Sequence, residues 1–363
     1  MGTGYGDSYA RCMDSLLTTT DIDALVRDLP KAELHVHLEG SMPPETFFEL
    51  ATAHGLTDVP TSLEALREWY AFTDFPHFAE VYLASVRTLR AEDDFALLAS
   101  VVARDLARHN VRYAEVHVSL YAHLVRGVPA ATVFSGIERA RMEAERDHGI
   151  QLRWIPDFPA DFGVEAAERT IAATLEHGPP SVVGFGVGGV ETPLEQYTHV
   201  FGRARAAGLA SLPHAGEQGG STRVREALDA LRAERIGHGI DALQDPELVA
   251  RLVDEQIPVD VSPTSNVCTR AVDRIEEHPL PSMLDAGLLV TLNTDDPPMF
   301  GTDLTREYRT AHALGLDAAA LVRLAANGVH ASYLGAARRR ALVREIDDVA
   351  RRHGVDVPYG ALV

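Results

Sequence analysis

Residues 32–38 read AELHVHL (Ala32–Leu38), a short run in which apolar side chains alternate with one glutamate and two histidines. Its brevity and the proline and glycine that flank it favour a strand over a helix. Seven further runs of this kind follow along the chain: Val111–Ser119, Leu152–Phe158, Val182–Val187, Leu209–Ala215, Arg235–Gly239, Ile257–Ser262 and Leu288–Thr294. The sequence therefore predicts eight short strands.

Between the predicted strands lie segments in which apolar residues recur at helical spacing. In Asp93–His109, the residues Phe95, Leu98, Val102 and Leu106 lie three or four positions apart. Similar segments are Ala130–His148, Val164–His177, Leu194–Ala207, Thr222–Ala233 and Pro246–Glu255. Strands that alternate with helices in this way predict an α/β fold, namely a parallel (β/α)8 TIM barrel.

The chain of 363 residues is long enough for two domains at ~150 residues each, but a TIM barrel of this size is often one domain. We therefore expect a loose leader over residues 1–20 and a single domain over residues 21–363. Leu63–Arg90, between the first two strands, has helical spacing and predicts cap helices over residues 60–92, near the barrel mouth. Beyond Asp303 the sequence predicts only helices.

The chain is acidic, with 33 Lys and Arg against 53 Asp and Glu and a net charge of −20. This charge argues against nucleic acid and anionic membranes as partners, because both attract basic surfaces. No stretch approaches the ~18 uninterrupted apolar residues of a membrane span. Cys12 and Cys268 are the only cysteines, too few for a disulfide framework or a thiolate zinc site. They favour a reducing, cytoplasmic compartment.

Ionisable side chains gather at the carboxyl ends of the predicted strands, the face on which TIM barrels build their active sites. Together with a few polar or small neighbours, these residues are His35, His37, His117, Asp157, Gly184, His214, Glu217, His238, Ser262, Asn266, Asp295 and Asp296. One histidine at a strand end is more often a packing residue. Five strand ends that deliver imidazole or carboxylate groups together are hard to explain by packing, so they predict an active site.

His35 and His37 are two residues apart, so on a strand both side chains lie on the same face and can bind one metal ion. This H-x-H pattern is a weak signal when it stands alone. His214 and Asp295 could complete a shell of three histidines and one aspartate. Nitrogen and oxygen ligands without sulfur suit Zn²⁺ best, although Fe²⁺, Co²⁺ or Mn²⁺ could also fit.

Three further ionisable residues accompany these ligands. Glu217 follows His214 by three residues, the position of a general acid or base beside the metal; the alternative is a solvated glutamate at a helix N-terminus. Neighbouring residues on a strand point to opposite sides, so Asp295 can bind the metal while Asp296 contacts the bound water; the alternative is a turn or helix cap before Pro297 and Pro298. His238, between two glycines, can stabilise or deprotonate this water, or it is a buried histidine that donates to the backbone.

Gly184–Gly189 (GFGVGG) fits the G-x-G-x-x-G pattern of dinucleotide-binding proteins. That fingerprint also needs an acidic residue ~20 positions further on, and none occurs between Glu195 and Glu217. We therefore interpret the glycines as a place where a flat ligand approaches the backbone closely.

In this order the motifs resemble the adenosine/adenine deaminase family of metal-dependent amidohydrolases. The resemblance extends from residue 30 to about 335 and rests on PKAELHVHLEGS (Pro30–Ser41), HAGE (His214–Glu217), ERIGHG (Glu234–Gly239), SPTSN (Ser262–Asn266) and NTDDPPMFGT (Asn293–Thr302). It implies a (β/α)8 barrel with one zinc held by His35, His37, His214 and Asp295. The implied reaction is hydrolytic deamination of a 6-aminopurine nucleoside to the 6-oxo product and ammonia.

The resemblance also implies a role for each neighbouring residue. Glu217 would protonate a ring nitrogen of the purine, and His238 and Asp296 would align the attacking water. Gly189 matches a glycine whose amide meets the purine. Glu39 stands where many adenosine deaminases have an aspartate that contacts the ribose 5′-hydroxyl, whereas adenine deaminases tend to have glutamate there.

FTDFPHF (Phe72–Phe78), FGVGGVE (Phe185–Glu191) and PTSN resemble the aminodeoxyfutalosine deaminase branch, whose substrate is an adenosine with a bulky 5′ aromatic extension. Phe72, Phe75 and His77 are expected to line the mouth as a cap over the ligand, with helix packing as the alternative. Adenosine, aminodeoxyfutalosine and adenine all stay open as substrates, with amide or ester hydrolysis a more remote reading. A non-catalytic nucleoside-binding barrel would not require Glu217 and Asp296.

Overall fold

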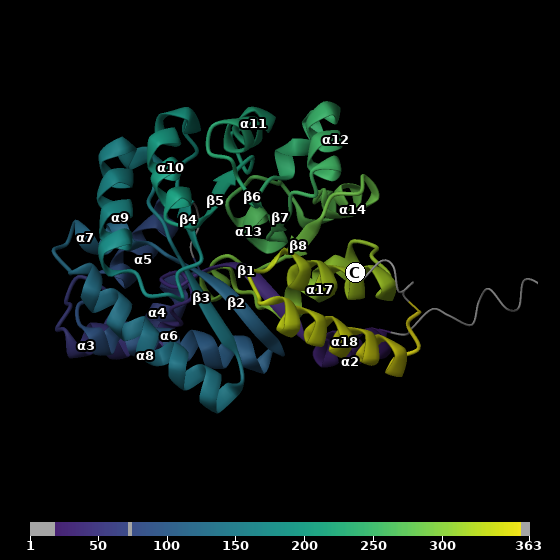
Figure 1. Ribbon diagram of the computed structural model, residues 1–363. Helices are drawn as coiled ribbons and strands as arrows, with labels where there is room; N and C mark the ends of the chain where they lie inside the picture. Colours follow the sequence, from purple (N-terminus) through teal and green to yellow (C-terminus); the bar gives the residue numbers. More distant parts are fainter. Residues whose placement is uncertain (1–18, 72–74, 357–363) are drawn as a thin grey trace, which may run out of the picture.

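The computed structural model describes residues 19–71 and 75–356, in which eight parallel strands form a barrel surrounded by helices (Figure 1). The strands are β1 (Lys31–His37), β2 (Val111–Val118), β3 (Gln151–Pro156), β4 (Gly184–Val187), β5 (Ala210–Ala215), β6 (Ile236–His238), β7 (Val259–Val261) and β8 (Val290–Leu292). They pair in chain order as two ladders, β1 to β3 and β4 to β8. Bridges between Trp154 and Val182 and between Val36 and Asp295 join the ladders into a closed ring. The predicted (β/α)8 barrel is confirmed.

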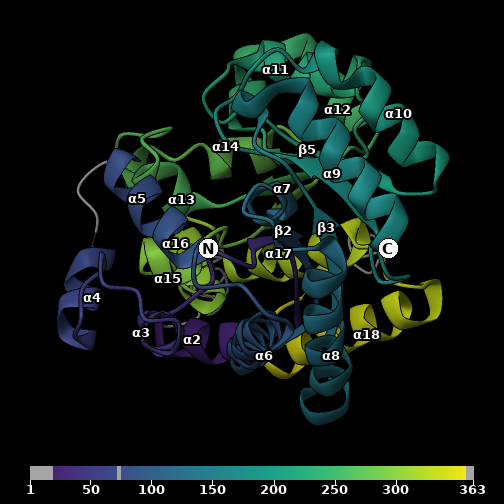
Figure 2. The ribbon, with the colours of Figure 1, turned by 90° about the vertical axis from the view of Figure 1, so that its left-hand side faces the viewer.

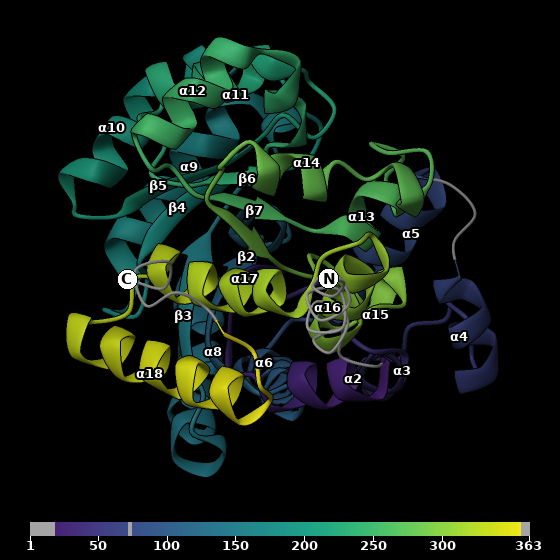
Figure 3. The same ribbon diagram turned by 90° about the vertical axis from the view of Figure 1, so that its right-hand side faces the viewer.

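The helices that follow strands β1 to β8 cover the outside of the barrel (Figures 1 and 3). They are α6 (Glu92–Arg108), α8 (Ala130–His148), α9 (Gly163–His177), α10 (Thr198–Ala206), α11 (Ser221–Asp229), α12 (Pro246–Asp254), α14 (Leu280–Asp285) and α17 (Ala318–Ala331). At one flank, α2 (Thr19–Asp28) lies beside α18 (Ala336–Arg352). No helix among the described residues is both long and apolar enough to cross a membrane.

Further helical segments lie in the loops between the elements named above. They are α7 (Leu120–Leu124), α13 (Pro263–Cys268), α15 (Pro297–Phe300), α16 (Leu304–Ala313) and the 3-10 turns Ala160–Phe162, Leu194–Tyr197, Ile240–Gln244 and Ile275–Glu277. The helix predicted over Leu194–Ala207 is therefore divided into a 3-10 turn and α10. By contrast, α8 has the predicted bounds, because Gly149 ends it with a left-handed φ of 67° that favours glycine.

The predicted cap stretch forms α4 (Leu63–Tyr70) and α5 (Phe75–Val86), preceded by α3 (Pro44–Ala53), which the sequence analysis did not predict. The Ser62 hydroxyl caps α4 by accepting a hydrogen bond from the Ala65 amide. At its other end, the Tyr70 hydroxyl donates to the Met42 carbonyl at 3.0 Å. Figures 2 and 3 both show α5 beside α13, with α4 at the periphery of the molecule.

Charged side chains fill part of the barrel interior, on the amino-terminal side of the strand ends. The Arg235 guanidinium forms ion pairs with Glu115 at 2.7 Å and Asp260 at 2.5 Å. The Thr291 hydroxyl donates to the other carboxylate oxygen of Asp260 at 2.6 Å. The arginine and both carboxylates are buried, so each charge depends on its partners for compensation.

Candidate active site

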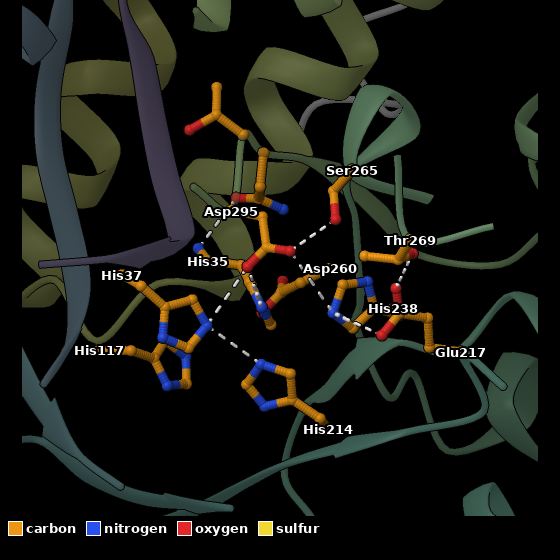
Figure 4. A network of polar contacts seen from close by, with 12 residues as sticks. His35, His37, His117, His214, Glu217, His238, Asp260, Ser265, Thr269 and Asp295 are labelled. Atoms are coloured by element: carbon orange, nitrogen blue, oxygen red, sulfur yellow. Dashed lines mark hydrogen bonds and ion pairs between the residues drawn. The ribbon is translucent and has the colours of Figure 1, made fainter. Parts of the chain in front are cut away.

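His35 and His37 on β1, His214 on β5 and Asp295 after β8 come together inside the barrel mouth (Figure 4). His37 Nε2 lies 3.2 Å from His214 Nε2 and 3.3 Å from Asp295 Oδ1, and His35 Nε2 lies 3.5 Å from the same oxygen. Tetrahedral metal bonds of ~2.0–2.1 Å would place ligand atoms ~3.3–3.4 Å apart. The separations therefore fit a single metal ion.

The protonation states of three of the four cluster residues, His35, His214 and Asp295, are suited to a cation. Burial lowers the pKa of His35 and of His214 well below 6.5, so both imidazoles are neutral. Burial acts the same way on His37, but hydrogen bonding to Asp295 and the charges of neighbouring aspartates raise the pKa of His37 to about 10. Burial also opposes ionisation of Asp295, yet bonds from His35 and His37 hold its pKa well below 3.8. A metal ion held by His37 would have to replace the proton on its ring nitrogen.

His117 on β2 and Asp157 after β3 adjoin the cluster, although both were expected only as polar residues at strand ends. Asp157 Oδ2 lies 3.2 Å from His117 Nδ1 and 3.7 Å from His37 Nδ1. Asp157 therefore lies on the Nδ1 side of the His37 ring, and Asp295 lies on the Nε2 side. Carboxylates in this position commonly orient the histidine ligands of metal sites. Gly186 on β4 makes room for the pair, because a Cβ there would lie 3.3 Å from His117 Nδ1.

Two site residues have backbone conformations that L-amino acids rarely adopt, since φ is 67° at Asp295 and 62° at His238. At Asp295 the hydrogen bonds of the β1–β8 junction hold the backbone: its amide donates to His35 O at 3.1 Å and its carbonyl accepts from His37 N at 2.8 Å. The Ser265 hydroxyl also donates to Asp295 Oδ2 at 2.6 Å. The carboxylate is therefore fixed from both its backbone and its side chain.

Asp296, the neighbour of Asp295, is buried, and its Oδ1 has no hydrogen-bond partner among the described residues. Burial and the charge of Asp295 raise the pKa of Asp296 well above 3.8. The next residues, Pro297–Phe300, form α15. Asp296 stands at the N-cap position of this helix, as the alternative interpretation expects, but its side chain makes no capping hydrogen bond.

Glu217 lies in the loop after β5, and several groups hold its carboxylate. Oε1 accepts a 2.6 Å hydrogen bond from the Thr269 hydroxyl and a 3.4 Å bond from Asn266 Nδ2. Oε2 lies 3.7 Å from His238 Nε2, a contact that is drawn as a dashed line in Figure 4. The Glu217 amide donates to Glu191 Oε1 at 2.8 Å. Neither Thr269 nor Glu191 was predicted as a site residue, because neither belongs to a metal-binding or acid–base pattern.

The predicted substrate-binding residues differ from one another in their burial and contacts. Glu39 is fully buried, with Oε1 2.7 Å from His123 Nε2 and Oε2 accepting from Ser119 N at 3.1 Å. A ribose hydroxyl could reach Glu39 only if neighbouring groups moved, because the residue has no exposed surface. Gly189 is exposed and has a φ of 73°. Gly188, beside it, lies against the His214 ring, where a Cβ would be 3.4 Å from Cε1.

In the predicted cap, the His77 ring on α5 lies 6.4 Å from the Trp69 ring, measured between centroids. Phe72 and the side chain of Phe75 lie outside the described residues. Instead, Phe78 of α5 stacks on Phe300 of α15 with 5.3 Å between ring centroids. An aromatic contact thus links the cap to the loop that carries the two aspartates, a pairing that no sequence periodicity reveals.

Comparison with known proteins agrees with this geometry. Residues 30–349 match the family model described as adenosine deaminase. The chain is 47% identical over 335 residues to an aminodeoxyfutalosine deaminase of Streptomyces avermitilis, covering 91% of this chain and 94% of that protein. The crystal structure of an adenine deaminase from Arthrobacter aurescens superposes with a TM-score of 0.85 at 36% identity, covering 89% and 99% of the two chains.

A zinc-bound amidohydrolase structure from Burkholderia ambifaria also has a TM-score of 0.85, at 28% identity, and covers 95% of this chain and 98% of that one. The family match spans most of the sequence, including every residue of the four-ligand cluster. The resemblance seen in the motifs is therefore confirmed, and the chain belongs to the adenosine deaminase family of hydrolytic deaminases.

Proposed function

We propose that this chain catalyses zinc-dependent hydrolytic deamination of a 6-aminopurine nucleoside, which yields the 6-oxo product and ammonia. The observation that carries the proposal is the convergence of the four predicted metal ligands with Glu217 and His238 at the barrel mouth. We further infer that the partner is a free purine nucleoside or base rather than nucleic acid, and that the protein works in the cytoplasm.

His35, His37, His214 and Asp295 would hold the metal. When bound, the ion acts as a Lewis acid that provides hydroxide at neutral pH. Donors of nitrogen and oxygen without sulfur favour Zn²⁺, and Fe²⁺, Co²⁺ and Mn²⁺ are the alternatives. The zinc in the related Burkholderia structure supports the same choice.

The remaining residues act on the substrate and the attacking water. In the proposed reaction the water oxygen adds to C6 of the purine as Glu217 donates a proton to N1. One proton of the water passes to the amino group, which leaves as ammonia, and the other returns to Glu217. Thr269 and Asn266 hold the Glu217 carboxylate in one orientation during this transfer. Asp296 and His238 would align the water, and Gly189 would meet the purine ring with its amide.

Aminodeoxyfutalosine is the first substrate to test, because the relative with 47% identity along nearly its whole length carries that activity in its name. Phe78 in cap helix α5 is only half-buried and stacks on Phe300, so its ring is a candidate contact for a bulky 5′ group. Adenine is the second candidate. Glu39, with both carboxylate oxygens already bonded within the protein, has the residue type that the resemblance associates with adenine deaminases.

The deciding experiment measures kcat/KM for aminodeoxyfutalosine, adenosine, 2′-deoxyadenosine and adenine side by side, with the zinc-loaded enzyme and ammonia release as the readout. We expect turnover of at least one of these, with aminodeoxyfutalosine the most efficient. A preference for adenine would select the second candidate. Absence of ammonia from all four, together with hydrolysis of amide or ester substrates, would overturn deamination.

A further inference from the structure

A chain of buried polar groups connects the start of α14 to His238. The Leu280 amide donates a hydrogen bond to His278 Nδ1 at 3.1 Å. A backbone N–H can only donate, so Nδ1 accepts and the ring proton lies on Nε2. Burial also lowers the pKa of His278 to about 4, which keeps the ring neutral near pH 7.

The second link is the side-chain amide of Asn266. His278 Nε2 lies 3.1 Å from Asn266 Oδ1, and since this nitrogen carries the proton, it donates to that oxygen. The amide is thereby oriented with its NH2 group toward the active site. Asn266 Nδ2 lies 3.4 Å from Glu217 Oε1. In this orientation the Asn266 NH2 group also faces Glu217 Oε1 and can donate to it.

The amide group then determines which nitrogen of His238 carries a proton. Asn266 Nδ2 is 3.2 Å from His238 Nδ1, so Nδ1 must accept and the His238 proton lies on Nε2. His238 Nε2 lies 3.7 Å from Glu217 Oε2 and 4.0 Å from Asp295 Oδ2. His238, Asn266 and His278 are at most 3% exposed, so solvent does not compete for these bonds.

We propose that His278 and Asn266 are positioning residues that hold His238 in the Nε2–H form, so that His238 donates a hydrogen bond to the attacking water instead of accepting its proton. The assignment of the proton to Nε2 rests on the hydrogen bonds alone. Its action on water rests on the proposed deamination. Of the two roles that the sequence leaves open for His238, this arrangement selects stabilisation over deprotonation.

The test is nitrogen-15 NMR of the zinc-loaded protein labelled at histidine, in which ring-nitrogen shifts distinguish protonated from unprotonated positions. Signals are assigned by comparison with His238→Gln and His278→Gln. We expect His238 to be protonated on Nε2 in the wild type. Asn266→Asp places an oxygen acceptor opposite Nδ1 and should move the proton to Nδ1, with kcat reduced about 100-fold. Wild-type His238 protonated on Nδ1, or an unchanged tautomer in Asn266→Asp, would overturn the proposal.

A rescue pair distinguishes positioning from a merely structural role. The glutamine in His278→Gln can still donate to Asn266 Oδ1, so kcat of this variant should stay within about 5-fold of the wild-type value. His278→Leu cannot donate, so its kcat should fall nearly as far as that of Asn266→Asp. Equal kcat and identical His238 shifts in the two variants would count against the relay. The NMR measurement uses no substrate, so failure of the protein to deaminate any purine would leave this test standing.

Discussion

The side chain of Asp296 occupies the space in which a β-carbon on Gly40 would lie. An ideal Cβ at position 40 would be 1.5 Å from Asp296 Oδ1 and 2.4 Å from its Cγ. Gly40 follows β1 and Asp296 follows β8, so the loops after the first and last strands interlock at this point. The Asp296 carboxyl group, which is proposed to align the water, can therefore take this position only because residue 40 has no β-carbon.

Gly40→Ala should displace the Asp296 carboxyl group by an ångström or more and reduce kcat about 100-fold. Zinc content, measured by elemental analysis, should stay near one per chain because the four ligands are untouched. Gly202→Ala on α10 is the matched control, since nothing lies within 4 Å of its Cβ position. Wild-type kcat in Gly40→Ala would show that Asp296 has no part in turnover.

Glu217→Gln removes the proton that Glu217 is proposed to donate and keeps the shape of the side chain. We expect kcat to fall about 1,000-fold or more, with zinc retained. Glu195→Gln, at an exposed position in the 3-10 turn before α10, controls for loss of one negative charge. An unchanged kcat in Glu217→Gln would remove this residue from the mechanism.

Thr269→Val deletes the hydroxyl that donates to Glu217 Oε1 at 2.6 Å. A typical hydrogen bond contributes ~0.5–1.5 kcal/mol, so loss of this orienting contact should reduce kcat about 5-fold, with a smaller effect on KM. Thr269→Ser keeps the hydroxyl and should stay close to the wild type. If Val and Ser variants behave alike in steady-state kinetics, the hydroxyl does not hold the carboxylate.

His214→Ala removes one of the four proposed ligands and should abolish stoichiometric zinc binding. A ligand that binds only the folded state raises Tm with its concentration, so added zinc should raise Tm of the wild type and leave the variant unchanged. His199→Ala, on the exposed side of α10, controls for loss of a histidine; its side chain is 77% exposed. Full zinc occupancy in His214→Ala would contradict the proposed shell.

Arg235→Leu leaves the buried carboxylates of Glu115 and Asp260 without their cation. Loss of one partner from a buried ion network costs ~3–5 kcal/mol, which urea denaturation would detect as a lower free energy of unfolding. Arg251→Leu breaks the surface pair with Asp229 at 2.7 Å and should cost under ~1 kcal/mol. Comparable losses in the two variants would contradict a special structural role for the barrel-interior cluster.

The sequence predicts the barrel well because strand and helix periodicity are local properties. The bounds of α8 follow from its apolar spacing and Gly149, and the strand-end pattern brings His35 and Asp295 to one face. Contacts between side chains that are brought together only by packing of distant segments could not be predicted from the sequence. No pattern links Asn266 to His278 across a loop, and the burial of Glu39 depends on His123 from another element. Side-chain partners of this kind are set by the tertiary fold.

The bridge between Val36 and Asp295 joins the first strand to the end of the last one. The candidate ligands lie on both sides of this junction, with His35 and His37 on β1 and Asp295 beyond β8. During synthesis, a chain that has emerged only as far as β7 lacks the fourth ligand and cannot close the ring. A bound cation would therefore connect the first and last strands of the barrel. A protein that retains the metal would then have a completely folded barrel as well as a complete active site.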